Sequence, residues 1–128
     1  MSAARFPVVI LISGRGTNLQ AIVDEVRAGR LPIDIRAVIS SNPDAAGLKP
    51  ARAAGLHTEV VDHRAYSTRA AFEQALAQAI DRHSPKLVAL AGFMRILGRE
   101  FIEHYHGRLT NIHPSLLPKY PGLGTHAR

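Results

Sequence analysis

Apolar residues follow two alternating patterns along this chain. The first is a short, continuous run such as residues 8–12 (VVILI), which is rich in β-branched side chains and typical of a strand buried on both faces. The second spaces apolar side chains three and four residues apart, as Leu19, Ile22, Val23 and Val26 are, and this spacing is typical of one face of a helix. Their alternation predicts βαβ units and a parallel sheet.

The elements that we predict from these patterns cover most of the chain. Strands are expected over residues 8–12, 33–39, 58–61, 87–90 and 109–113. Helices are expected over residues 18–28, 45–54, from a cap at Ser67 or Thr68 to about His83, and 99–105. The fold class is therefore α/β, with a Rossmann-like, mostly parallel sheet that carries helices on both faces in a single domain over residues 1–128.

Three segments with glycine or polar residues come after predicted strands. They are residues 13–16 after the first strand, 92–95 after the fourth, and 111–113 in or just after the fifth. In open parallel sheets, ligands bind beyond the carboxyl ends of the strands. We therefore expect these three segments to meet at one edge of the sheet.

The glycine turn at residues 13–18 (SGRGTN) is typical of a phosphate cradle, because glycines let backbone N–H groups approach an anion and the following helix contributes its dipole. It is a poor dinucleotide-binding fingerprint, since Leu19 occupies the position of the third glycine. It also lacks the Gly-Lys-Ser/Thr of a Walker loop. A tight turn without any ligand remains the alternative.

Asn111 and His113 are two residues apart on a predicted strand, so their side chains face the same side. An amide and an imidazole there can both donate hydrogen bonds to a developing oxyanion. Pro114 restricts His113 to an extended backbone. A structural histidine beside a proline-rich turn remains the alternative, and no Asp or Glu follows Glu103 to pair with the imidazole.

Composition narrows the function classes. The 128 residues include 46% hydrophobic and 20% charged residues and no cysteine, which indicates a globular domain and excludes a disulfide scaffold and thiolate zinc sites. The formal charge of +6 is scattered, which disfavours nucleic acid and is compatible with small anionic substrates or with a surface that is simply basic. No apolar run suits a membrane helix and no signal peptide is recognisable, so we expect a cytoplasmic protein without membrane or nucleic-acid partners.

The remaining histidines and one arginine are further candidate ligands for a metal ion or an anion. A metal site needs three or four ligands, and we find no third beside His104 and His106, so no metal is expected. His57, His63 and His83 are expected to be solvated. Arg69 lies in the first turn of a predicted helix, which is unfavourable for the helix dipole and is compatible with an anionic partner; a solvated charge on the helix is the alternative that its position alone favours.

Three motifs together resemble phosphoribosylglycinamide formyltransferases. They are residues 11–20 (LISGRGTNLQ), 92–97 (GFMRIL) and 111–122 (NIHPSLLPKYPG), in the order of that family, and the resemblance extends over the whole chain. Methionyl-tRNA formyltransferases usually have Arg-Gly after the tyrosine, where Pro121 and Gly122 follow Tyr120 here. Formyltetrahydrofolate deformylases carry an additional N-terminal domain, for which this chain has no room.

The resemblance implies transfer of the formyl group from 10-formyltetrahydrofolate, the cosubstrate, to N1-(5-phosphoribosyl)glycinamide in purine biosynthesis. Asn111 and His113 would be catalytic. The other roles that it implies are substrate binding by Gly16, Thr17 and Asn18, and folate binding by Arg69, Met94, Arg95, Ile96, Leu97 and Asn111.

Members of that family continue well beyond the third motif, where a later segment supplies an Asp that pairs with the histidine. We therefore expect residues 1–128 to be the truncated N-terminal part of a formyltransferase domain, with an exposed sheet edge and no activity alone. A homodimer is an option that the sequence leaves open. The alternative functions are a methionyl-tRNA formyltransferase-like enzyme and a nucleotide-binding module without catalysis.

Overall fold

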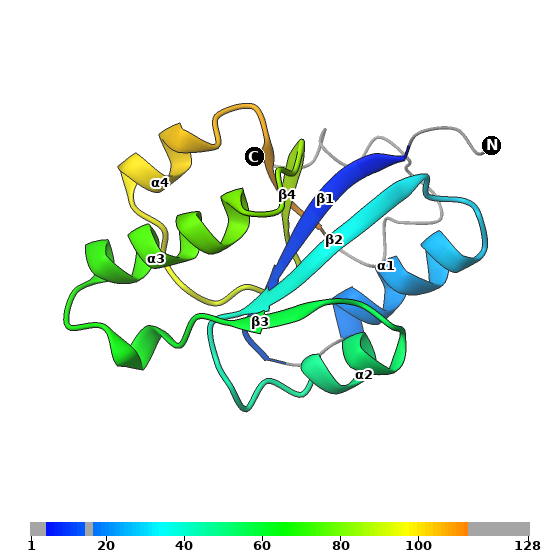
Figure 1. The fold of residues 1–128 in the computed structure, drawn as a ribbon, viewed down its shortest axis with the longest axis horizontal. Helices are drawn as coiled ribbons and strands as arrows, with labels where there is room; N and C mark the ends of the chain where they lie inside the picture. Colours follow the sequence, from blue (N-terminus) through cyan, green and yellow to red (C-terminus); the bar gives the residue numbers. More distant parts are fainter. Residues whose placement is uncertain (1–4, 15–16, 113–128) are drawn as a thin grey trace.

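A computed structural model describes residues 5–14 and 17–112 of the chain. Its centre is a five-stranded sheet in the order β3-β2-β1-β4-β5 (Figure 1). All four strand pairs are parallel, which confirms the predicted sheet. The strands are β1 (Phe6–Ile12), β2 (Ile33–Ser40), β3 (Thr58–Val60), β4 (Leu87–Leu90) and β5 (Leu109–Asn111).

Helices cover both faces of this sheet, as predicted. The first pair, α1 (Thr17–Arg27) and α2 (Leu48–Ala53), packs on one face, and the second pair, α3 (Arg69–Asp81) and α4 (Arg99–His104), packs on the other (Figure 1). A 3₁₀ turn, η1 (His63–Ala65), connects β3 to α3 and has no apolar periodicity that would predict it.

The central strand β1 supplies side chains to both layers. Ile10 and Ile12 point into the cluster beneath α1, whereas Val9 and Leu11 point into the cluster beneath α3, and all four are fully buried. Burial on both faces explains why residues 8–12 form a continuous apolar run with no polar alternation.

One element boundary differs from the prediction and another agrees with it. Helix α2 begins at Leu48, not at residue 45, because residues 42–47 are held in turns by the Asn42 side chain and by a hydrogen bond from Gly47 N–H to the Gly14 carbonyl, 3.0 Å long. Helix α3 has the predicted cap: Thr68 Oγ1 accepts the N–H of Ala71 at 3.1 Å.

The strand order creates a switch point beside β1. The chain places β2 and β3 on one side of β1 and later returns to place β4 and β5 on the other. Helices leave the sheet in opposite directions at such a point, which opens a crevice beyond the carboxyl ends of β1 and β4. Within the described residues, no helix is both long and apolar enough to cross a membrane.

Candidate functional site

Ser13 joins three segments at the carboxyl end of β1. Its hydroxyl oxygen accepts the N–H of Met94 at 2.8 Å and lies 2.8 Å from the hydroxyl of Ser41, which follows β2. Ser13 is only 9% exposed, so these hydrogen bonds are shielded from water. The buried hydroxyl therefore holds the segment after β4 against the ends of β1 and β2.

Asn18 joins the first helix to the end of β5. Its Nδ2 donates a hydrogen bond to the carbonyl of Ile112 over 3.2 Å. The chain also passes close to it at Gly92, where a Cβ atom would lie 3.9 Å from Asn18 Nδ2 and where the φ angle of 75° favours glycine. The three segments predicted to meet at one edge of the sheet do meet there.

The predicted catalytic pair is only partly within the described residues. Asn111 is the last residue of β5 and its side chain is exposed at the carboxyl edge of the sheet. His113 and Gly16 lie outside the described residues, so the pairing of Asn111 with His113 stays a prediction. The same holds for the phosphate cradle, of which the structure describes Gly14 and Asn18 but not Arg15 or Gly16.

A hollow of about 370 Å³ lies beside these segments, between the start of α3 and the segment after β4. It brings together four of the predicted folate-binding residues, Arg69, Met94, Arg95 and Ile96. Its other lining residues are His63, Tyr66, Ser67, Thr68 and Phe72.

The hollow has an apolar wall with cationic groups at its rim. Met94 and Ile96 are 71% and 76% exposed, which is unusual for large apolar side chains and typical of a surface that binds a ligand. Arg69 and Arg95 add two guanidinium groups. The hollow therefore suits a flat apolar ring that carries anionic groups. Leu97, the fifth predicted folate residue of this region, packs instead against the apolar cluster beneath α3.

Arg69 has an anionic partner inside the chain. Its Nε lies 3.6 Å from Glu73 Oε2, although the arginine side chain remains 61% exposed. The Glu73 carboxylate is largely buried, and it also accepts the N–H of Gly98 at 2.8 Å, just before α4. Glu73 therefore offsets part of the unfavourable position of Arg69 while leaving its guanidinium accessible to a ligand.

Sequence reasoning missed the part of the hollow contributed by residues 62–67. His63 was expected to be solvated, but its Nδ1 lies 3.0 Å from the Ser41 carbonyl and its ring packs edge-on against Phe72. The turn is held by Asp62, which accepts the N–H of Arg64, and the Arg64 guanidinium lowers the pKa of that carboxyl. The Asp at the start of this turn was the one available signal, since Asp commonly caps short helical turns.

Two further histidines also depart from the prediction of free surface side chains. His83 contacts the carboxylate of Glu59 and is 19% exposed in its side chain, so it is not simply solvated. His104 has a carboxylate partner as well, since its Nε2 lies 2.9 Å from Asp81 Oδ2 on α3. Both partners come from distant parts of the sequence.

Comparison with known proteins gives one consistent family. The profile of the Formyl transferase family matches residues 6–128. A phosphoribosylglycinamide formyltransferase of Escherichia coli is 52% identical over 119 residues, which are 93% of this chain and 56% of that protein. The trifunctional purine biosynthetic protein adenosine-3 of Bos taurus is 44% identical over 119 residues, which are 93% of this chain and 12% of that protein.

Solved structures agree with this result. The structure of a phosphoribosylglycinamide formyltransferase from Coxiella burnetii matches with a TM-score of 0.83 and 54% identity, over 96% of this chain and 58% of the other. The chain thus spans slightly more than half the length of the two bacterial proteins.

Proposed function

The chain belongs to the formyl transferase family, and from this premise we propose that the protein it forms part of transfers the formyl group of 10-formyltetrahydrofolate to the amine of N1-(5-phosphoribosyl)glycinamide, a step of purine biosynthesis. The observation that carries the proposal is the convergence of the three motif segments, fixed by hydrogen bonds from Ser13 and Asn18. It supports a single site for both reactants.

The hollow beside α3 is the proposed folate site. Its exposed Met94 and Ile96 give an apolar surface for the ring system, and the Met94 N–H is held in place by Ser13. Arg69 and Arg95 are suited to the carboxylates of a folate tail, because guanidinium groups pair with carboxylates at a solvent-exposed rim. Leu97 and Asn111 complete the proposed set, Leu97 from beneath and Asn111 from β5.

The start of α1 is the proposed site of the substrate phosphate, with Gly16, Thr17 and Asn18 as its residues. Helix α1 has 11 residues and no acidic residue in its first turn, so the positive end of its dipole favours an anion there. Asn18 uses its Nδ2 on the Ile112 carbonyl, which leaves its side-chain oxygen for a hydroxyl group of the substrate.

The chemistry needs a nucleophile, an oxyanion stabiliser and a proton carrier. In the proposed reaction the substrate amine attacks the formyl carbon, and the carbonyl oxygen becomes an oxyanion in a tetrahedral intermediate. Asn111 and His113 donate hydrogen bonds to that oxygen, and His113 helps to move the proton from the amine to the departing folate nitrogen. Collapse of the intermediate breaks the bond between the formyl carbon and that nitrogen.

Three wider proposals accompany this function. Residues 1–128 would be the N-terminal part of one α/β domain, since each of the two bacterial proteins extends well past the matched region. The protein would act in the cytoplasm on small molecules, and it would do so as a monomer or a homodimer. The sheet offers β5 as an edge strand to which further chain can pair.

The direct test is formyl transfer by the full-length protein, measured with 10-formyltetrahydrofolate and phosphoribosylglycinamide and compared with methionyl-tRNA as the acceptor. We expect formylated phosphoribosylglycinamide and no formylated tRNA. Transfer to the tRNA would show the related tRNA enzyme instead. Binding of the nucleotide without any transfer would support a binding module.

A further inference from the structure

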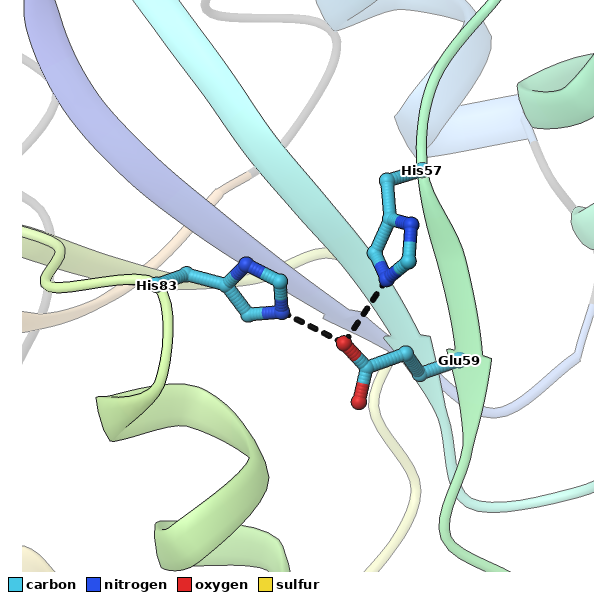
Figure 2. Close-up of side chains that lie close together, drawn as sticks. All are labelled: His57, Glu59 and His83. Atoms are coloured by element: carbon cyan, nitrogen blue, oxygen red, sulfur yellow. Dashed lines mark hydrogen bonds and ion pairs between the residues drawn. The ribbon is translucent and has the colours of Figure 1, made fainter.

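Two imidazoles and one carboxylate converge away from the proposed formyl-transfer site (Figure 2). His57 directly precedes β3, Glu59 is the middle residue of β3, and His83 lies between α3 and β4. The cluster therefore lies where β3 and β4 are entered, whereas the site residues follow the ends of the strands. In the part of the chain that the structure describes, this is the one group of three side chains arranged to bind a metal ion.

The three ligand atoms lie close enough together to share one small cation. His57 Nε2 lies 2.9 Å from Glu59 Oε2, His83 Nε2 contacts the same oxygen, and the three atoms all lie within 4.8 Å of one another. A tetrahedral zinc ion with bonds of about 2.0–2.2 Å holds its ligands about 3.4 Å apart. The distances from His57 Nε2 and His83 Nε2 to Glu59 Oε2 would therefore have to increase for the ion to fit between these atoms.

Neighbouring groups already orient the proposed ligands. Arg82 donates to Glu59 Oε1 at 2.9 Å, which leaves Oε2 for the two rings, and Arg36 donates to the backbone carbonyl of His83 at 3.3 Å. Such contacts fix ligand side chains in metal sites.

The donor set selects the type of cation. The single carboxylate, whose other oxygen accepts a hydrogen bond from Arg82, gives too few oxygen ligands for Ca²⁺ or Mg²⁺, which bind mainly through oxygen atoms. Two imidazole nitrogens with one carboxylate suit Zn²⁺ and its neighbours in the first transition row. The carbonyl end of the 13-residue helix α3, just before His83, contributes a further partial negative charge.

We propose that His57, Glu59 and His83 bind one divalent transition-metal ion of the Zn²⁺ class, with the remaining coordination positions open to water. Because the His57 side chain is 57% exposed, the ion enters directly from solvent and exchanges readily. Its binding fastens β3 to the loop between α3 and β4, so its effect is on stability rather than on chemistry at the other site. This inference does not depend on formyl transfer.

The experiment uses the full-length protein after treatment with a chelator, followed by titration with Zn²⁺. Calorimetry gives the number of ions bound, and thermal unfolding gives Tm. We expect one equivalent bound at the cluster and a Tm that rises with the logarithm of free Zn²⁺ once the site is saturated. A protein that shows neither saturable uptake nor any rise in Tm contradicts the proposal.

Single-residue variants test whether the ion binds at this cluster. His57→Gln and His83→Gln remove one proposed ligand each and should weaken Zn²⁺ binding at least about tenfold, because even supporting residues outside the ligand set are worth about 10- to 100-fold. His106→Gln removes an exposed histidine elsewhere and should leave binding unchanged. His57 is exposed enough for its variant to fold even if the His83 variant does not. Equal Zn²⁺ binding by His57→Gln and the unmodified protein would refute the site.

Discussion

At the residue scale, Asn111 offers a direct test of the chemistry, because its side chain is exposed at the end of β5. In Asn111→Ala we expect kcat to fall about 100- to 1,000-fold, the usual cost of one lost oxyanion donor. Unfolding should change little. Single-turnover formyl transfer and a thermal melt of the full-length variant measure the two effects.

The matched control is Gln78→Ala, which truncates another exposed amide, on α3. It should leave kcat unaltered. A kcat within threefold of the parent in Asn111→Ala would remove this residue from the mechanism.

Arg69 allows an equally specific test of the folate hollow. Arg69→Gln should raise KM for 10-formyltetrahydrofolate about fivefold, because an exposed ion pair contributes roughly 1 kcal/mol or less. The expected change in kcat is small. Steady-state kinetics with the folate varied at saturating acceptor separates the two constants.

Arg99→Gln is the comparison variant, because Arg99 is also the first residue of a helix and is exposed, but it does not line the hollow. Any general effect of removing a positive charge from a helix N-terminus appears in both variants. If both raise KM equally, Arg69 has no specific role with folate.

Residues of the site could be predicted only where they belong to a local motif. Met94 belongs to the motif at residues 92–97, Arg69 was singled out by its place in the first turn of a predicted helix, and the hollow brings the two together. His63 and Tyr66 also line it, but they come from a 3₁₀ turn without periodicity. The contact of His83 with Glu59 crosses 24 positions of sequence, so no spacing rule could reveal it.

At the scale of elements, Glu73 couples α3 to α4. Its carboxylate accepts a hydrogen bond from the Gly98 N–H and pairs with Arg69. The residue is only 8% exposed, so this hydrogen bond is shielded from water. Glu73→Ala leaves that N–H without its partner, and we expect a loss of about 1–3 kcal/mol in the free energy of unfolding. Urea denaturation measures it.

Glu103→Ala serves as the reference for Glu73, since Glu103 is an exposed residue of α4. Its effect should stay within about 0.5 kcal/mol. If the two variants unfold at the same urea concentration, the bond from Gly98 does not stabilise the junction of the helices.

The elements themselves were largely predictable because burial dictates their pattern. Strands β1 and β4 lie inside the sheet with helices on both faces, and their apolar runs show it directly. The start of α2 was predicted three residues too early, since the hydrogen bond from Gly47 N–H to the Gly14 carbonyl ties the residues before α2 to the segment after β1. Local propensity does not contain such contacts.

At the scale of the whole molecule, Ser13 marks the switch point of the sheet. Ser13→Ala removes the acceptor of the Met94 N–H and the partner of Ser41 together. We expect a loss of about 1–3 kcal/mol in stability and a higher KM for folate, because the segment after β4 loses its anchor. Denaturation and kinetics of the same preparation report both effects.

Ser41→Ala separates the two contributions. It removes the second hydroxyl but leaves Ser13 to accept the Met94 N–H. Its stability should fall while KM stays near that of the parent. An identical rise of KM in both variants would show that the hydroxyl pair, rather than the bond to Met94, positions the hollow.

The position of β1 in the sheet also has a consequence for biosynthesis. A ribosome delivers β1 and β2 early, and they can pair at once, but the other edge of β1 pairs with residues 87–90, which emerge much later. Until then the most apolar strand of the molecule presents open backbone groups to any nascent chain nearby. The strand at the centre of the finished sheet is thus open along one edge during synthesis, and an open strand edge is where aggregation can begin.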